Sequence, residues 1–257
     1  MPDRCHCLIR RRFAMPNYHF PSDDSLRAAP PAAATLTQQV YETLREEILS
    51  GALKPGRRLV RRELGQRLGV SPVPVTEALL RLEIEGLVQS RPLYGCRVRP
   101  LTLCDVQNDA VLREAIECQA ARLCAERATA QSLSRLAAQA RRLDRLMADG
   151  QPQSRAGRLA HSEFHLAIAR LTSYARLAEE LQRVWFRRLM WMNWIKATHC
   201  KRVPRDWHQR LVEAIAAGDP GGAEARMREH VRYGNEDDQT ALRYLLEHNV
   251  NDWEDLP

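Results

Sequence analysis

The spacing of apolar residues between residues 37 and 100 constrains the fold of this chain more than any other feature. Apolar residues recur every three or four positions from Val40 to Leu49, which predicts an amphipathic helix. Gly and Pro residues after Ser50 end it, and Arg61 to Leu68 predicts a short second helix. Gly69-Val70-Ser71 then forms a tight turn, with Ser71 as the N-cap of a third helix from Pro72 to Glu85.

Two short β-prone segments follow the third helix. Leu87-Val88 and Cys96-Arg97-Val98 flank the glycine turn Leu93-Tyr94-Gly95, which predicts a β-hairpin. A helix-turn-helix unit whose second helix is free can enter a DNA major groove about 12 Å wide, and a hairpin after it can act as a wing. The pattern therefore favours a winged helix that binds DNA.

The distribution of charge agrees with an anionic partner for this region. Residues 1–100 carry 16 Lys and Arg against 10 Asp and Glu, whereas residues 101–257 carry 23 against 22. A basic first part alone leaves open an Arg-rich, solvated surface, but the charges coincide with the winged-helix pattern. The basic residues that lead into the turn or flank the hairpin are Lys54, Arg57, Arg58, Arg61, Arg62, Arg67, Arg91, Arg97 and Arg99.

The second half of the chain shows helical periodicity and no strand signal, so we expect an all-helical bundle. The fold class is mainly α: a winged helix-turn-helix with a small β-hairpin, then the bundle. The expected helices are Leu103–Thr129, Gln131–Asp149, Arg158–Leu171, Ala175–Thr198, Pro204–Ala217 and Gly222–His248. The expected domains are a flexible tail at 1–34, a DNA-binding domain at 35–100, an effector-binding and dimerisation domain at 101–250, and a C-terminal tail at 251–257.

Membrane and secreted classes do not fit the sequence. No stretch reaches the roughly 18 to 20 apolar residues of a membrane span. The seven Cys are an odd number scattered along the chain, which favours reduced thiols over a disulfide framework. We therefore expect a cytoplasmic protein with no membrane partner. The sequence does not decide whether Met1 or Met15 is the true start.

Histidines on apolar helix faces are the most informative feature of the second half. His165, His208 and His230 each lie on an apolar stripe, and His161 lies one turn before His165 on the same side. A single buried His is usually a core residue with satisfied hydrogen bonds. Four that converge in a bundle would suit a divalent transition metal such as zinc or nickel. The residues alone leave both interpretations open.

Arg113 also has apolar neighbours at helical spacing, at Ala110, Ile116 and Ala120. Its guanidinium is therefore expected to point into the bundle, where it needs an anion or dense hydrogen bonding. An internal salt bridge to a Glu would meet that need.

A run of residues from 40 to 88 carries a family signature. It comprises Val40-Tyr41-Glu42, Leu44-Arg45, Ile48-Leu49-Ser50-Gly51, Leu53-Lys54-Pro55-Gly56, Arg58-Leu59, Gly69-Val70-Ser71-Pro72, Pro74-Val75, Glu77-Ala78-Leu79, Arg81-Leu82-Glu83 and Glu85-Gly86-Leu87-Val88. The run closely resembles the winged-helix domain of GntR-family transcription regulators. The resemblance implies DNA contacts at Arg62, Ser71, Thr76, Tyr94 and Gly95. The family usually has Arg where this chain has Thr76, which puts the usual operator preference in doubt.

The second half carries another signature. It comprises Glu117, Ala120-Ala121-Arg122-Leu123, Arg127-Ala128-Thr129, Phe164-His165, His208, Leu211, Ala214-Ile215, Gly218-Asp219, Met227 and His230. This pattern resembles the FCD effector domain of the FadR subfamily within GntR. The resemblance implies a metal held at His161, His165, His208 and His230, and an effector carboxylate held by Arg113. His161 replaces the usual Asp, so the site would be more positive.

Together these features favour a ligand-responsive transcription regulator. We expect a homodimer, more readily a repressor than an activator, that binds a palindromic operator on double-stranded DNA, with a small organic acid as effector. The alternative is a metal-dependent enzyme in which a histidine-bound ion activates water. An enzyme needs a general base or acid near the ion, and the nearest carboxylate in sequence, Glu163, points away from His161 and His165. We therefore expect a sensor and no catalytic residues.

Overall fold

The computed structural model describes residues 35–100, 102–149, 154–195 and 204–247, with the side chains of 195 and 236–247 left undescribed. The expected tails at 1–34 and 251–257 lie outside these residues. Among the described residues, the first part of the chain forms α1 (Leu36–Leu49), β1 (Arg58–Leu59), α2 (Arg61–Leu68), α3 (Pro72–Ile84), β2 (Val88–Arg91) and β3 (Gly95–Val98).

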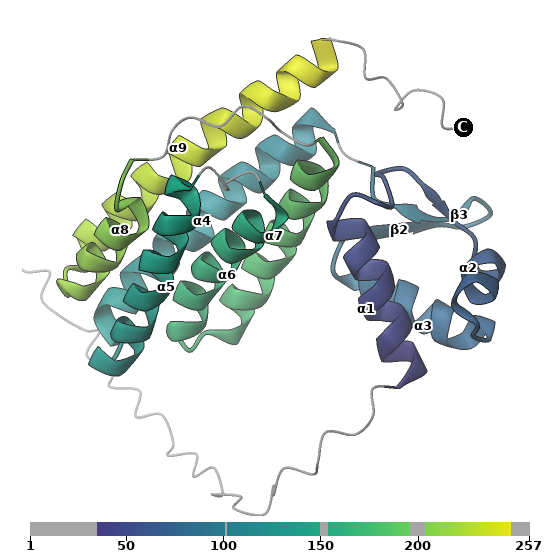
Figure 1. Ribbon diagram of the computed structural model, residues 1–257, viewed down its shortest axis with the longest axis horizontal. Helices are drawn as coiled ribbons and strands as arrows, with labels where there is room; N and C mark the ends of the chain where they lie inside the picture. The colour runs from purple at the N-terminus through teal and green to yellow at the C-terminus, as the bar shows by residue number, and fades with distance from the viewer. Residues whose placement is uncertain (1–34, 101, 150–153, 196–203, 248–257) are drawn as a thin grey trace, which may run out of the picture. The chain divides into compact units, whose positions relative to one another are not determined.

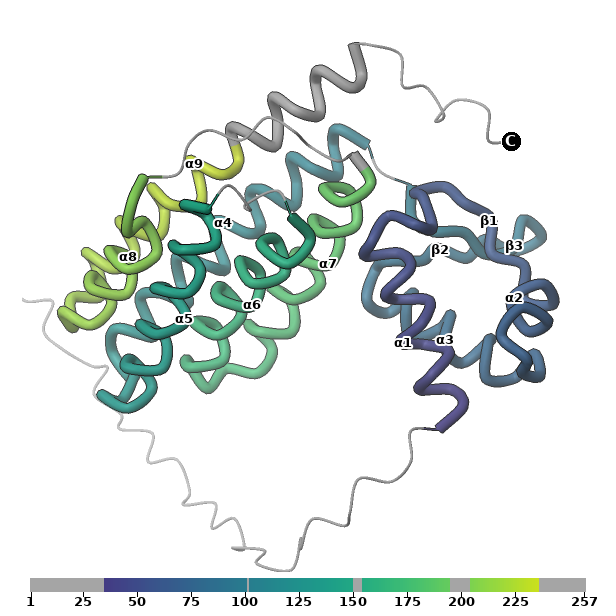
Figure 2. The backbone as a smooth tube through the Cα atoms, in the orientation of Figure 1, coloured from purple at the N-terminus to yellow at the C-terminus, as the bar shows by residue number. Residues whose placement is uncertain are grey.

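The three strands form one antiparallel sheet in the order β1-β3-β2 (Figure 2). The hairpin of β2 and β3 was predicted, but β1 was not, because a two-residue strand leaves no periodic signal. Its register pairs Leu59 with Cys96, and Val88 pairs with Val98, so four buried side chains share the inner face. That face joins apolar residues of α1 and α3 in one core.

Two glycines shape the turn between α2 and α3. Gly69 ends α2 with φ +66°, a conformation that other residues rarely adopt, and a Cβ at Gly65 would lie 2.9 Å from the carbonyl oxygen of Val70. Ser71 occupies the predicted N-cap position of α3, but its hydroxyl makes no capping hydrogen bond. Pro72 at the start of α3 removes one N–H that would otherwise need a partner.

Every secondary-structure element that the structure describes after residue 101 is a helix (Figure 1). α4 packs against α6, α7 and α9, and α5 packs against α6 and α8. Their buried apolar side chains form one hydrophobic cluster around Trp185 and Phe164. The helices are α4 (Leu103–Arg127), α5 (Ala130–Ala148), α6 (Arg155–Leu171), α7 (Ala175–Ile195), α8 (Trp207–Ala216) and α9 (Pro220–Glu247).

The predicted fold class is confirmed, although two of the predicted helix starts were wrong by three residues. α6 begins three residues earlier than predicted, because the Ser154 hydroxyl caps it by accepting from the N–H of Gly157. α8 begins at Trp207 rather than Pro204, because Asp206 adopts φ +58° and cannot continue a helix from Pro204. None of the described helices is both long and apolar enough to cross a membrane.

Candidate metal centre and DNA-contacting surface

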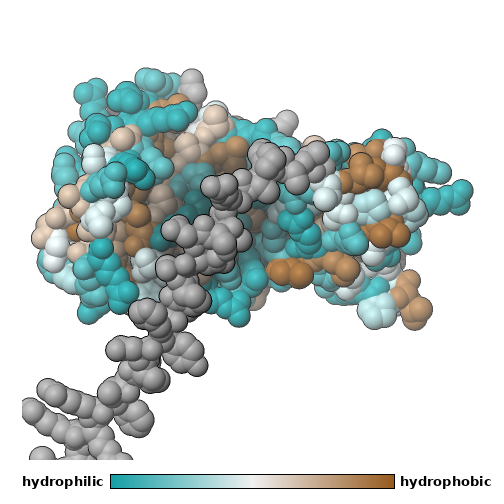
Figure 3. Space-filling view, turned by 90° about the horizontal axis from the view of Figure 1, so that it is seen from below, coloured by the Kyte–Doolittle hydropathy of each residue, from teal (hydrophilic) through white to brown (hydrophobic). Residues whose placement is uncertain are grey.

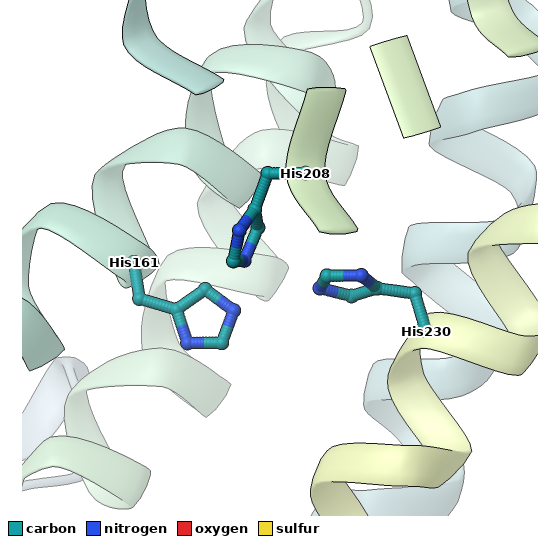
Figure 4. A group of neighbouring side chains, drawn as sticks. All are labelled: His161, His208 and His230. Atoms are coloured by element: carbon teal, nitrogen blue, oxygen red, sulfur yellow. The ribbon is translucent and has the colours of Figure 1, made fainter. Parts of the chain in front are cut away.

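Three imidazoles from three helices meet inside the helical bundle. His161 comes from α6, His208 from α8 and His230 from α9, and Figure 4 shows their rings pointing toward one another. One ring nitrogen of each lies within 4.8 Å of those of the other two. His208 and His230 are buried and His161 is partly exposed. Three of the four histidines that the sequence pattern pointed to thus lie in one cluster.

His165 lies beside this cluster. Its Nε2 atom is 3.0 Å from Nε2 of His161, and its Nδ1 atom is 2.8 Å from Oε2 of Glu117. Two ligand nitrogens that each lie about 2.1 Å from one ion are separated by about 3 to 3.5 Å. The distance between His161 and His165 is therefore compatible with a shared ion. The ring nitrogens of His161, His208 and His230 lie up to 4.8 Å apart, so these rings would need to move slightly closer to bind one ion.

The nitrogens of the cluster suit a transition metal. Within the described part of the chain, the buried Nε2 of His208 and Nδ1 of His230 have no hydrogen-bond partner. A buried polar atom without a partner costs free energy of folding, unless a bound ion or water interacts with it. Burial, with the charges of neighbouring groups, holds the pKa values of His161 and His230 well below the ordinary value. Neutral imidazole is the form that binds zinc, nickel, iron or copper. The donor set therefore fits such an ion, which would supply positive charge to an anionic ligand.

Two carboxylates that the sequence analysis did not single out as site residues support the histidines. Asp144 on α5 contacts Nδ1 of His208, and Glu117 on α4 contacts Nδ1 of His165. Asp144 interrupts the apolar stripe of Leu136 and Ala140 on α5, and a carboxylate on a buried stripe was the signal that could have identified it.

Arg113 lies inside the bundle, as its apolar neighbours indicate, and is 2% exposed. Its Nε atom lies 3.3 Å from Oε1 of Glu117, so the internal salt bridge considered from sequence is present. Trp185 donates from Nε1 to the same carboxylate oxygen at 2.9 Å. Burial acts to raise the pKa of Glu117, but the charges of His165 and Arg113 outweigh it and lower that pKa.

A second buried arginine, Arg188 on α7, was missed from sequence. It lines the same small cavity as Arg113, and each guanidinium carbon lies about 5 Å from the Trp185 ring centroid, at 4.9 and 5.0 Å. Its position on a helix rich in Arg and Trp gave no distinguishing pattern. The cavity is lined by Val106, Asp109, Arg113, Arg188, Trp191 and Asn235, among others.

In the winged helix, the residues expected to contact DNA are mostly exposed. Arg62 lies on the surface of α2, and Tyr94 is 63% exposed beside Gly95 at the hairpin turn. Thr76 is partly buried, and its hydroxyl donates to the carbonyl oxygen of Pro72 at 2.9 Å. Arg67, one of the basic residues that lead into the turn, donates two hydrogen bonds to Glu47, at 2.9 and 2.7 Å.

The exposed face of α3 is more apolar than a solvated helix requires. Val73, Leu80 and Ile84 are all more than half exposed. In Figure 3, apolar patches stand out on a largely hydrophilic surface. Exposed apolar groups on a helix of this kind can contact thymine methyl groups or another protein surface.

Comparison with known proteins bears on both parts of the chain. Residues 36–98 match the family described as bacterial regulatory proteins, gntR family, and residues 110–233 match the FCD domain. The chain is 31% identical to the probable D-xylose utilization operon transcriptional repressor of Paenarthrobacter nicotinovorans, over 77% of this chain and 86% of that one. This chain belongs to the GntR family.

Two further relatives agree with this assignment. This chain is 36% identical to the HTH-type transcriptional regulator YdfH of Escherichia coli O6:H1. The match covers 42% of this chain and only 45% of YdfH. The solved structure of McbR/YncC from E. coli superposes with a TM-score of 0.63 and 25% identity, covering 84% of this chain and all of that chain. Both matched families and these relatives belong to transcription regulators, so the comparisons do not support the metal-dependent enzyme.

Proposed function

We propose that this GntR-family chain is a transcription regulator that binds double-stranded DNA through residues 35–100. Arg62, Ser71, Thr76, Tyr94 and Gly95 would contact the operator. The exposure of Arg62 supports a phosphate contact, and the open hairpin turn supports an approach of the wing to the DNA. A single winged helix contacts half a site, so the protein would act as a homodimer on a palindromic operator in the cytoplasm.

The helical domain would control DNA binding in response to a small organic acid. A divalent ion, zinc or nickel first among the candidates, would be held by His161, His208 and His230, with His165 as a fourth ligand. The observation that carries this proposal is the pair of buried ring nitrogens without hydrogen-bond partners in the described part of the chain. Arg113 would hold a carboxylate of the effector from the neighbouring cavity, with its Glu117 contact rearranging on binding.

Repression is the proposed direction of regulation, because the D-xylose operon relative is named a repressor. A repressor whose ligand lowers its affinity for DNA needs two bundle arrangements that differ in ligand affinity. The ion and Arg113 are the groups that would differ between them.

The ion is tested first, by elemental mass spectrometry of protein purified without chelators. We expect about one divalent ion per chain in the wild type and in Glu163→Gln, whose carboxylate is exposed and pairs with Arg170 on the surface. His208→Ala should lose the ion. A wild type that binds no zinc or nickel even after titration would contradict the metal centre while leaving DNA binding to be judged separately.

A further inference from the structure

Asp144 makes an unusual set of contacts to the first turn of α8. Its Oδ1 atom accepts from Nδ1 of His208 at 2.6 Å and from the backbone N–H of His208 at 3.1 Å. Its Oδ2 atom accepts from the backbone N–H and from Nε2 of Gln209, both at 3.1 Å. One largely buried carboxylate on α5 thus accepts four hydrogen bonds from two consecutive residues of another helix.

These contacts replace the usual N-cap of α8. The N-cap residue, Asp206, lies at φ +58° and its own side chain makes no capping hydrogen bond. The first N–H groups of a helix need an acceptor, and a carboxylate there is also favoured by the helix dipole. Asp144 therefore caps α8 from α5 and attaches the two helices to each other.

A cap alone does not explain the shortest of the four contacts. The carboxylate accepts at Nδ1 of His208, so this nitrogen carries the ring proton and the lone pair lies on Nε2. That Nε2 atom is buried and has no hydrogen-bond partner among the described residues. His208 belongs to the cluster with His161 and His230. A carboxylate on the far nitrogen of a metal-binding imidazole fixes the ring orientation and makes the ligand more basic.

We propose that Asp144 is the positioning residue that presents Nε2 of His208 to a divalent ion, and that ion binding in turn fastens the first turn of α8 to α5. The proposal rests on the proposed metal centre. Binding of a cation at Nε2 makes the Nδ1–H group a stronger donor, which strengthens its bond to Asp144. The same carboxylate accepts from the backbone of His208 and Gln209, so occupancy of the ion site is coupled to the docking of α8.

The first test measures zinc affinity by competition with a chromophoric chelator, using the full-length protein. Asp144→Asn keeps an oxygen that can accept from His208 but removes the charge, and we expect zinc to bind roughly 10- to 100-fold more weakly. The matched control is Gln209→Ala, which removes one hydrogen bond to Oδ2 and leaves the contact to Nδ1 intact. It should bind zinc like the wild type.

The second test uses the wild-type protein, so it does not require any variant to fold. Zinc added to wild-type protein that a chelator has stripped of metal should slow hydrogen exchange in peptides covering residues 207–210 more than in peptides from α1 of the winged helix. Wild-type protein that binds no zinc would contradict the metal centre itself. Wild-type protein that binds zinc while Asp144→Asn binds it equally well, or while exchange at the start of α8 is unchanged, would overturn the role of Asp144 and leave the metal centre standing.

Discussion

The hydroxyl of Thr76 donates to the carbonyl oxygen of Pro72, 2.9 Å away and one turn earlier on α3. A threonine bonded in this way has committed its proton to its own helix, so the methyl group is what it can add to a base contact. The exposed Val73 lies three residues earlier on the same face. We therefore expect the first turn of α3 to favour thymine, whose methyl group lies in the major groove.

Substitutions of Thr76 test this expectation. Thr76→Val keeps the methyl group and should recover the wild-type operator motif from a random duplex library. Thr76→Arg introduces a donor suited to guanine, and should change the preferred motif more than the overall affinity. Identical motifs from wild type and Thr76→Arg would place Thr76 outside the base-contacting surface.

Arg62 gives a prediction about phosphate contacts. Its removal in Arg62→Ala should weaken binding to all sequences to a similar extent and reduce the slope of log affinity against log salt by about 0.9 if one phosphate contact is lost. Fluorescence anisotropy across a salt series measures both quantities. The control is Arg141→Ala, which removes an exposed charge from α5 in the helical domain. An unchanged slope in Arg62→Ala would argue against this contact.

The raised pKa of Tyr41 predicts that the free energy of unfolding of the winged helix depends on pH. Burial, together with a hydrogen bond to Glu85 of 2.5 Å and the charge of that residue, raises the pKa of Tyr41 to about 12. The unfolded chain loses this proton near pH 10, so the folded state binds more protons between pH 10 and 12. The free energy of unfolding should be unaffected below pH 10 and should fall by about 2 kcal/mol as the pH rises to 12.

Tyr41→Phe provides the comparison. It should lower the free energy of unfolding by about 1 kcal/mol at pH 7, through loss of the hydrogen bond, and should abolish Tyr41's part of the decline above pH 10. Chemical denaturation at several pH values measures this. A decline of the same size in both proteins would show that Tyr41 does not cause it.

Arg113 and Glu117 are best examined as a pair. Glu117→Gln leaves the Arg113 charge buried without its carboxylate, and should lower the free energy of unfolding by roughly 3 kcal/mol. Because the two residues interact, the double variant Arg113→Met/Glu117→Gln should cost clearly less than the two single changes added together. Thermal or chemical denaturation of the four proteins gives the coupling. Additive effects would mean that the salt bridge contributes little.

The winged helix was predictable because its signals are local. Val40 to Leu49 has a clear helical period, and Gly69 marks a turn that requires positive φ. β1 was not predictable, because its two residues are strand only through pairing with β3. The start of α8 was missed for a similar reason, since Asp144, far away in sequence, supplies the cap that Asp206 does not.

Of the candidate metal centre, only the histidines were predictable from the sequence. His208 and His230 lie on apolar stripes, and apolar stripes face the core, so their proximity followed from amphipathic periodicity. Periodicity does not reveal which helices are neighbours, and therefore could not place Asp144 beside His208 or Glu117 beside His165. Arg188 was missed for the same reason, because its location beside Arg113 depends on the packing of α7 against α4.

We expect an organic acid bound in the helical domain to control DNA binding by the winged helix. The most direct test of this control is fluorescence anisotropy, which measures the affinity of the zinc-loaded protein for DNA from upstream of its gene and for random duplex. Both affinities are measured with and without organic acids selected by a thermal-shift screen. We predict specific binding that at least one acid weakens by roughly 5-fold or more, with the response lost in His208→Ala while its DNA binding persists. Equal affinity for random duplex would contradict specific DNA binding, and an operator affinity that no stabilising acid alters would contradict control by an organic acid.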